Sequence, residues 1–135
     1  MDSAGGYWRA GPLRIRQVLM RVLVCGGRNY SDQQAVYDAL DELHRVRKFE
    51  LVIAGGARGA DTLAEQWAKD RAIPTKIYQA DWETLGRKAG PIRNQRMLDE
   101  GLPQLVIAFP GGRGTADMTS RAREAAVETI LIGDR

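Results

Sequence analysis

Cysteine and histidine are almost absent from this chain, whose 135 residues include one of each, Cys25 and His44. A structural zinc or iron–sulfur centre needs several such ligands, so the sequence predicts no metal site and no required cofactor. One cysteine also excludes an intrachain disulfide. Because Cys25 lies within an apolar run, we expect a small buried core residue in a reducing compartment. His44, between Leu43 and Arg45, is expected on a solvated helix face.

Long hydrophobic runs are missing as well. No apolar run approaches the roughly 18 residues of a membrane-spanning helix, and the N-terminal MDSAGGYWRAGPLRIRQ lacks the apolar core of a signal peptide. We therefore expect a cytoplasmic protein with no membrane partner. The complete G-x-G-x-x-G fingerprint is also absent after the first predicted strand, where the sequence reads GGRNY at 26–30, so an ordinary NAD-dependent dehydrogenase is not predicted.

The composition that remains suits one compact domain: 44% of the residues are hydrophobic and 27% are charged. Residues 1–19 show no clear periodicity and are interpreted as a flexible N-terminal tail or an added edge strand, and residues 20–135 as a single domain. The formal net charge of +3 favours anionic partners without choosing between nucleotides and nucleic acid.

From residue 20 onward, short β-branched runs alternate with longer amphipathic segments, which is typical of βαβ units. Strands are predicted at 21–25, 51–54, 75–78, 105–109 and 129–132. Helices are predicted after Ser31 or Asp32, from residue 60, at 91–100 and at 116–126, with 81–90 as a polar surface loop. Trp67 shares a helix face with small apolar residues, so it is assigned to the core. The fold class is α/β, a Rossmann-like three-layer domain of about five parallel strands in the order 3-2-1-4-5, with helices on both faces.

Three of the strands are followed by glycines and an arginine, in the segments VLVCGGR, LVIAGGAR and LVIAFPGGR. The carboxyl ends of parallel strands meet at one edge of a sheet, so Arg28, Arg58 and Arg113 are expected around a single crevice. In the order 3-2-1-4-5, the switch point lies between the first and fourth strands. Gly26 and Gly111 should therefore lie side by side there.

The segment 110–115, PGGRGT, is the strongest single signal in the chain. A strand that runs through three glycines into a helix presents backbone N–H groups and a helix N-terminus at one point, an arrangement that attracts phosphate. Glycines allow close approach of a ligand, which a Cβ would obstruct. The sequence therefore predicts a phosphate loop, with an ordinary tight turn as the alternative.

Together with GGARGAD at 55–61 and GRKAGPIRN at 86–94, this loop resembles the SLOG superfamily, and more closely its YspA-like, YpsA-related branch. The resemblance covers residues 20 to 135. It implies a Rossmann-like fold shared with Lonely Guy phosphoribohydrolases, which release a base from a nucleoside 5′-monophosphate, with DNA-processing protein A, and with members thought to sense nucleotide-derived ligands. Relatives are often dimers, so a homodimer or higher oligomer is also implied.

The resemblance and the loop pattern together nominate one set of site residues. The resemblance gives Arg93 and Asn94 the part of the ligand-facing helix motif. The candidate ligand-binding residues are Gly26, Gly27, Arg28, Gly55, Gly56, Arg58, Gly59, Asp61, Arg93, Asn94, Pro110, Gly111, Gly112, Arg113, Gly114 and Thr115. The loop at 81–90, with Trp82 and Arg87, is expected either to cover the ligand or to form a subunit contact.

One position departs from the hydrolase pattern. Where Lonely Guy enzymes carry a glutamate that assists loss of the base, this chain has Met118, and a thioether cannot stabilise an oxocarbenium-like state. Met118 is expected to pack inward on its helix. Asp61 and Asp117, each at the start of a helix, are candidate substitutes, with Arg93 as a third candidate catalytic residue. The alternative for both carboxylates is helix capping, worth about 0.3–1 kcal/mol.

Three functions follow, in order of preference. The first is binding or sensing of a small phosphorylated ligand, a nucleotide or an ADP-ribose-like molecule. The second is a nucleotide N-glycosidase of the phosphoribohydrolase kind. The third is binding of single-stranded nucleic acid through Trp8 and the arginines of the N-terminal tail, for which an unstructured tail is the simpler interpretation.

Overall fold

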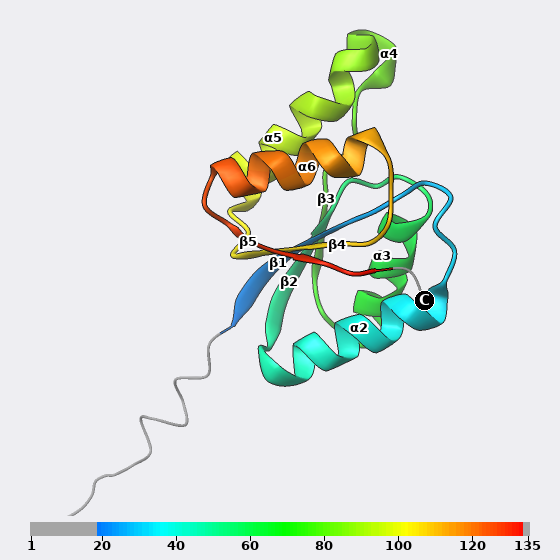
Figure 1. Cartoon of the computed structure of the whole chain (residues 1–135), viewed down its shortest axis with the longest axis vertical. Helices are drawn as coiled ribbons and strands as arrows, with labels where there is room; N and C mark the ends of the chain where they lie inside the picture. Colours follow the sequence, from blue (N-terminus) through cyan, green and yellow to red (C-terminus); the bar gives the residue numbers. More distant parts are fainter. Residues whose placement is uncertain (1–18, 134–135) are drawn as a thin grey trace, which may run out of the picture.

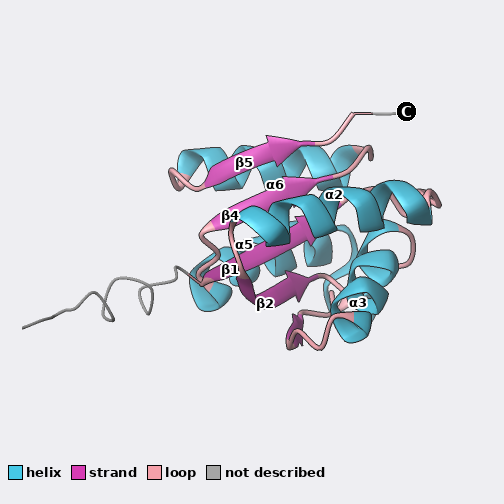
Figure 2. Ribbon diagram, turned by 90° about the horizontal axis from the view of Figure 1, so that it is seen from below, coloured by secondary structure: helices cyan, strands magenta, loops and turns pink. Residues whose placement is uncertain are grey.

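The computed structural model describes residues 19–133, and the predicted N-terminal tail lies outside them except for Leu19. Five parallel strands form one sheet in the order β3-β2-β1-β4-β5. The predicted fold class and strand order are thereby confirmed. Each neighbouring pair is parallel, and Figure 2 shows β5, β4, β1 and β2 running in the same direction, with helices on both sides of the sheet.

The elements follow the βαβ alternation. In chain order they are β1 (Met20–Cys25), α2 (Gln33–Val46), β2 (Phe49–Ala54), α3 (Ala60–Asp70), β3 (Thr75–Ile77), α4 (Trp82–Leu85), the 3-10 helix η2 (Gly86–Lys88), α5 (Ala89–Gly101), β4 (Leu105–Ala108), α6 (Arg113–Glu124) and β5 (Glu128–Leu131). Helices α2 and α3 cover one face of the sheet, and α5 and α6 cover the other (Figure 1). No helix in residues 19–133 combines the length and apolar character needed to cross a bilayer.

Each face of the sheet has its own core because successive strand residues point to opposite sides. Val22 and Val24 pack with Trp67 on the α2/α3 side. Leu23 and Cys25 pack with Met118 on the α5/α6 side. The predictions that Cys25, Trp67 and Met118 are core residues are confirmed, since their exposed fractions are 8%, 0% and 1%.

Residues 81–90, predicted as a loop, are mostly helical, so that prediction was wrong. The Asp81 carboxylate accepts the backbone N–H of Thr84 at 3.2 Å, which starts α4. Gly86, with φ +59°, then redirects the chain into η2, and α5 begins at Ala89, two residues before its predicted start. Local capping therefore starts a short helix in a stretch that has no amphipathic pattern.

Helix α6 begins at Arg113, three residues earlier than predicted. The second half of the predicted phosphate loop is therefore the first helical turn. The low helix propensity of Gly114 argued against a helix at this position, but tertiary packing outweighs propensity.

The placement of His44 on a solvated face was also wrong. Its Nδ1 accepts the backbone N–H of Phe49 at 3.0 Å, and its ring lies edge-on to Trp67.

Candidate functional site

A cavity of about 1120 Å³ opens at the carboxyl edge of the sheet, between the ends of β1 and β2 and the starts of α5 and α6. It is large enough for a nucleotide-sized ligand. Arg28, Arg58 and Arg113 all line it, as the parallel topology predicts. The other nominated residues that line it are Gly26, Gly27, Gly55, Gly56, Asp61, Arg93, Asn94, Gly112, Gly114, Thr115 and Asp117.

The N-terminus of α6 forms one wall of this pocket. Its N-cap is Gly112, which has no side chain to accept the first-turn amides. The first intrahelical bond runs from the N–H of Ala116 to the carbonyl of Gly112, so the amides of Arg113, Gly114 and Thr115 precede it. A Cβ built at Gly112 or Gly114 meets open space. These glycines leave the amides and the positive end of the helix dipole open to the pocket.

Two other glycines, Gly26 and Gly111, allow parts of the chain to pack closely together. A Cβ at Gly26 would lie 2.5 Å from Cβ of Ala60, and one at Gly111 would lie 2.7 Å from the backbone nitrogen of Gly27. The N–H of Gly27 is donated to the carbonyl of Pro110 at 2.9 Å. The loops after β1 and β4 are thus side by side at the switch point, as predicted. Pro110 and Gly111 themselves fall outside the pocket lining.

The glycines in the loop after β2 also have different roles. Gly59, with φ +83°, sits against the carbonyls of Gly27 and Arg28, where a Cβ would collide. It lines a smaller hollow of about 350 Å³ that shares Arg28 and Arg58 with the main pocket. Gly55 contacts the Arg93 guanidinium instead and faces the main pocket.

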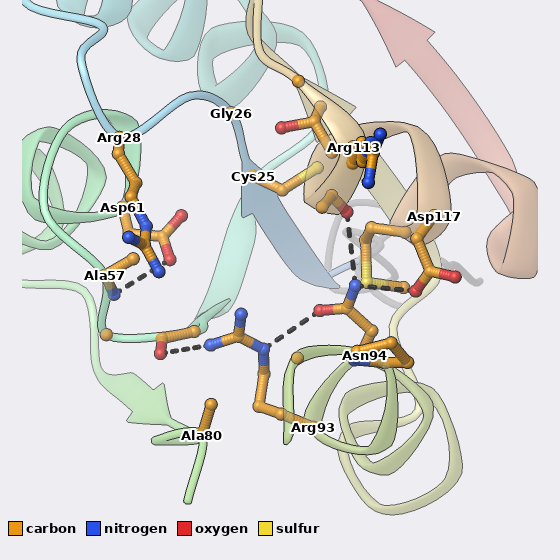
Figure 3. Close-up of a pocket in the computed structure, with 18 of the residues that line it drawn as sticks. Cys25, Gly26, Arg28, Ala57, Asp61, Ala80, Arg93, Asn94, Arg113 and Asp117 are labelled. Carbon is orange, nitrogen blue, oxygen red and sulfur yellow. Dashed lines mark hydrogen bonds between the residues drawn. The ribbon is translucent and has the colours of Figure 1, made fainter. Parts of the chain in front are cut away.

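Arg93 and Asn94 connect the two halves of the site. Nη1 of Arg93 donates to the carbonyl of Gly55 at 2.6 Å, and Nε donates to Oδ1 of Asn94 at 3.0 Å. Nδ2 of Asn94 donates to the carbonyl of Gly114 at 3.2 Å and to Oδ2 of Asp117 at 3.0 Å. Figure 3 shows this chain of bonds, with the Arg93 guanidinium pointing toward the side of the pocket that holds Cys25 and Asp61.

Asp61 is the buried carboxylate of the site, with 6% of its surface exposed. Its Oδ2 accepts the N–H of Ala57 at 3.2 Å. Burial raises the pKa of Asp61 to about 6, although hydrogen bonding to Ala57 and the charge of Arg93 act in the opposite direction. Burial and the Asp61 charge also raise the pKa of Cys25 to about 12, so its thiol is un-ionised. Asp61 is therefore a carboxyl that titrates near neutrality at the pocket wall.

Asp117 has a different environment. Burial alone would raise its pKa, but hydrogen bonds from Arg121, at 2.8 Å, and from Asn94 outweigh that effect and lower the pKa of Asp117. Met118 lines the pocket with a thioether, which carries no charge. Within residues 19–133, no group of three His, Cys, Asp or Glu side chains is placed to hold a metal ion.

The pocket is also lined by residues outside the predicted ligand-binding set. Gln79 and Ala80 lie two and three residues after the end of β3, and their position beyond a strand's carboxyl end was the available signal. Trp82 of α4 and Arg87 of η2 also line the pocket, at the segment expected either to cover the ligand or to form a subunit contact. Cys25, Gly90, Pro91 and Met97 also line the pocket.

This parallel sheet, with its pocket at the switch point, defines a Rossmann-like α/β protein. The chain belongs to the YspA, cpYpsA-related SLOG family, whose model matches residues 20–84. It is also similar to the Gene 61 protein of Mycobacterium phage D29, with 40% identity over 125 residues that cover 87% of this chain and 99% of that protein. The family match includes the loops after β1 and β2 and ends within α4.

Proposed function

We propose that this chain binds a small phosphorylated, nucleotide-derived ligand in the pocket, with the phosphate at the N-terminus of α6. The observation that carries the proposal is the glycine-capped first turn of α6. Three consecutive amides precede the first helical hydrogen bond there, and the flanking glycines leave room for an anion. Membership of the SLOG family supports the same ligand class.

The charge of the pocket lining supports an anionic ligand. Its cationic side chains outnumber its two carboxylates, Asp61 and Asp117. Asp117 is already paired with Arg121, which lies outside the lining. The arginines that line the pocket are Arg28, Arg58, Arg87, Arg93 and Arg113. A cytoplasmic location suits this function, because a nucleotide pool is present there and a lone buried thiol stays reduced.

A nucleotide N-glycosidase is the second candidate, and the buried Asp61 favours it. A carboxyl with a pKa of about 6 is suited to proton transfer near neutral pH. Met118 counts against the phosphoribohydrolase route because it supplies no charge to the reacting sugar. Release of free base from nucleoside monophosphates, detected by chromatography and lost in Asp61→Asn, would favour the enzyme over the binding domain.

The binding proposal is tested by placing a carboxylate where the phosphate would lie. We expect Gly114→Asp to fold, because a Cβ at this position meets open space and an acidic residue in the first turn is favourable. The same change should abolish binding through charge repulsion. Thermal shift with a panel of nucleotides measures both effects: a ligand at 100 times its Kd should stabilise the unsubstituted chain by about 2.7 kcal/mol, or roughly 10 °C.

Ser120→Asp is the matched control. It adds the same charge to the exposed surface of α6, beyond the first turn and outside the pocket lining. It should retain the full ligand-induced shift. A nucleotide that stabilises Gly114→Asp as strongly as the unsubstituted chain would overturn the placement of the phosphate, and a lack of stabilisation by every compound would overturn the proposal itself.

A further inference from the structure

A half-exposed tryptophan stands at the edge of the pocket. Trp82 is the first residue of α4, lines the cavity and has 48% of its surface exposed. Trp67, in contrast, is fully buried and donates its Nε1–H to Asp41 at 2.9 Å. Trp82 therefore contributes little to the core and presents a large aromatic surface to whatever enters the pocket.

Two features restrict the orientation of the Trp82 indole. Asp81 caps α4 and so fixes the backbone at Trp82. The far end of the ring rests on Gly90, where a Cβ would lie only 3.1 Å from Cη2. The absence of a side chain at Gly90 thus permits this orientation. A platform already held in position loses little conformational entropy when a ligand stacks on it.

The loop after β1 supplies the present neighbour of the ring. The guanidinium carbon of Arg28 lies over the Trp82 ring, 5.6 Å from its centroid. A cation–π contact at an exposed site favours its partners by about 2- to 5-fold. A nucleobase stacked on an aromatic ring gains roughly 5- to 150-fold in affinity. A base can therefore replace the guanidinium on this ring with a net gain.

We propose that Trp82 is the stacking platform for a nucleobase, so that the ligand is a base-containing nucleotide and not a bare sugar phosphate. This inference rests on the proposed function, in which α6 binds the phosphate. Arg28 leaves the ring when the base arrives and stays in the pocket lining, where it offers a charge to the ligand. Trp82 acts as a specificity-determining residue that distinguishes nucleotides from other phosphorylated metabolites.

Calorimetric titration of the full chain with AMP, UMP and ribose 5-phosphate tests the inference. A purine and a pyrimidine are both used because stacking tolerates any base. The two nucleotides should bind more tightly than ribose 5-phosphate. Trp82→Ala should weaken AMP and UMP by about 5- to 150-fold and leave ribose 5-phosphate unchanged, while Trp82→Phe should retain most of the affinity.

Leu85→Ala is the matched control, since Leu85 is a 39%-exposed residue of the same short helix that does not line the pocket. It should alter none of the three affinities. Equal weakening of all three compounds by Trp82→Ala would overturn the base platform. Binding of ribose 5-phosphate with no gain from a base would overturn it too and leave the phosphate site standing. Failure of the unsubstituted chain to bind any of the three would refute the base platform, while the wider nucleotide panel decides the proposed function.

Discussion

At the scale of single residues, the environment of Asp61 is the most unusual in the site. The carboxyl is 6% exposed and lies near Arg93, yet burial outweighs the favourable charge and keeps its pKa high. A buried carboxylate that no direct ion pair compensates lowers the stability of the fold when it ionises. Such a residue is characteristic of functional sites more than of structural ones.

The pH dependence of stability should reveal this cost. The folded-state pKa of Asp61 is raised from 3.8 to about 6, so the folded chain binds more protons than the unfolded chain between these values. The stability that Asp61 contributes is therefore complete below pH 3.8 and is lost as pH rises through 6. Relative to Asp61→Asn, the unsubstituted chain should lose about 3 kcal/mol over this range.

Urea unfolding of both proteins at pH 4, 5, 6 and 7 measures the difference. Because the other titrating groups are common to the two proteins, subtracting the two free energies of unfolding isolates Asp61. The free energy of unfolding of the unsubstituted chain minus that of Asp61→Asn should fall as pH rises. A value that stays constant or increases with pH would contradict the assignment.

At the scale of elements, Asn94 joins α5 to α6. Asn94 is 4% exposed, and its amide group serves Arg93, Gly114 and Asp117 together. The carbonyl of Gly114 belongs to the turn whose amides face the pocket. One buried side chain therefore positions the N-terminus of α6 relative to the ends of β2 and β3, which Arg93 contacts through Gly55 and Tyr78.

Removal of this amide should be costly. Asn94→Ala leaves the Gly114 carbonyl and Asp117 without one donor, and we expect a loss of about 1–3 kcal/mol in the free energy of unfolding. Asp99→Ala on the same helix removes only an exposed bond from Gln95 and should cost no more than about 0.5 kcal/mol. Urea unfolding of both variants at pH 7 measures these losses. Equal losses in the free energy of unfolding would show that Asn94 does not stabilise the contact between α5 and α6.

At the scale of the whole molecule, the centre of the sheet is buried much more completely than its edges. All residues of β4 are buried, and β1 has partners on both sides. Strands β3 and β5 are exposed or half-buried throughout, and α4 has no buried residue. The buried centre thus holds the loops after β1 and β4, while Trp82 lies on α4, an element without buried residues.

Native-state hydrogen exchange should follow this gradient. Amides of β1 and β4 should exchange only through global unfolding, whereas those of α4 should exchange through local opening at a much lower free energy. Measurement across low urea concentrations separates the two modes. Protection in α4 equal to that in β1 would contradict the gradient, and a selective rise in α4 protection with bound AMP would agree with a base on Trp82.

The strand order was predicted from the sequence, and each strand lies within two residues of its predicted bounds. Strands β1, β2 and β4 appear in the sequence as apolar runs followed by glycines, and general rules of connection then give the strand order and the shared edge. The helical start at Arg113 and the short helices α4 and η2 were missed because capping and packing, which outweigh weak local propensity, determine them. Homodimer formation and nucleic-acid binding by the N-terminal tail stay predictions.

By itself, the sequence determined that strands end in glycine loops at one edge and that arginines gather there. Only the tertiary structure separated Gly112 and Gly114, which open toward the pocket, from Gly26 and Gly111, which let two loops pack together. It alone decided the raised pKa of Asp61 as well. The physical reason is the same in each case: burial and close contact depend on residues distant along the chain, which a local pattern does not specify.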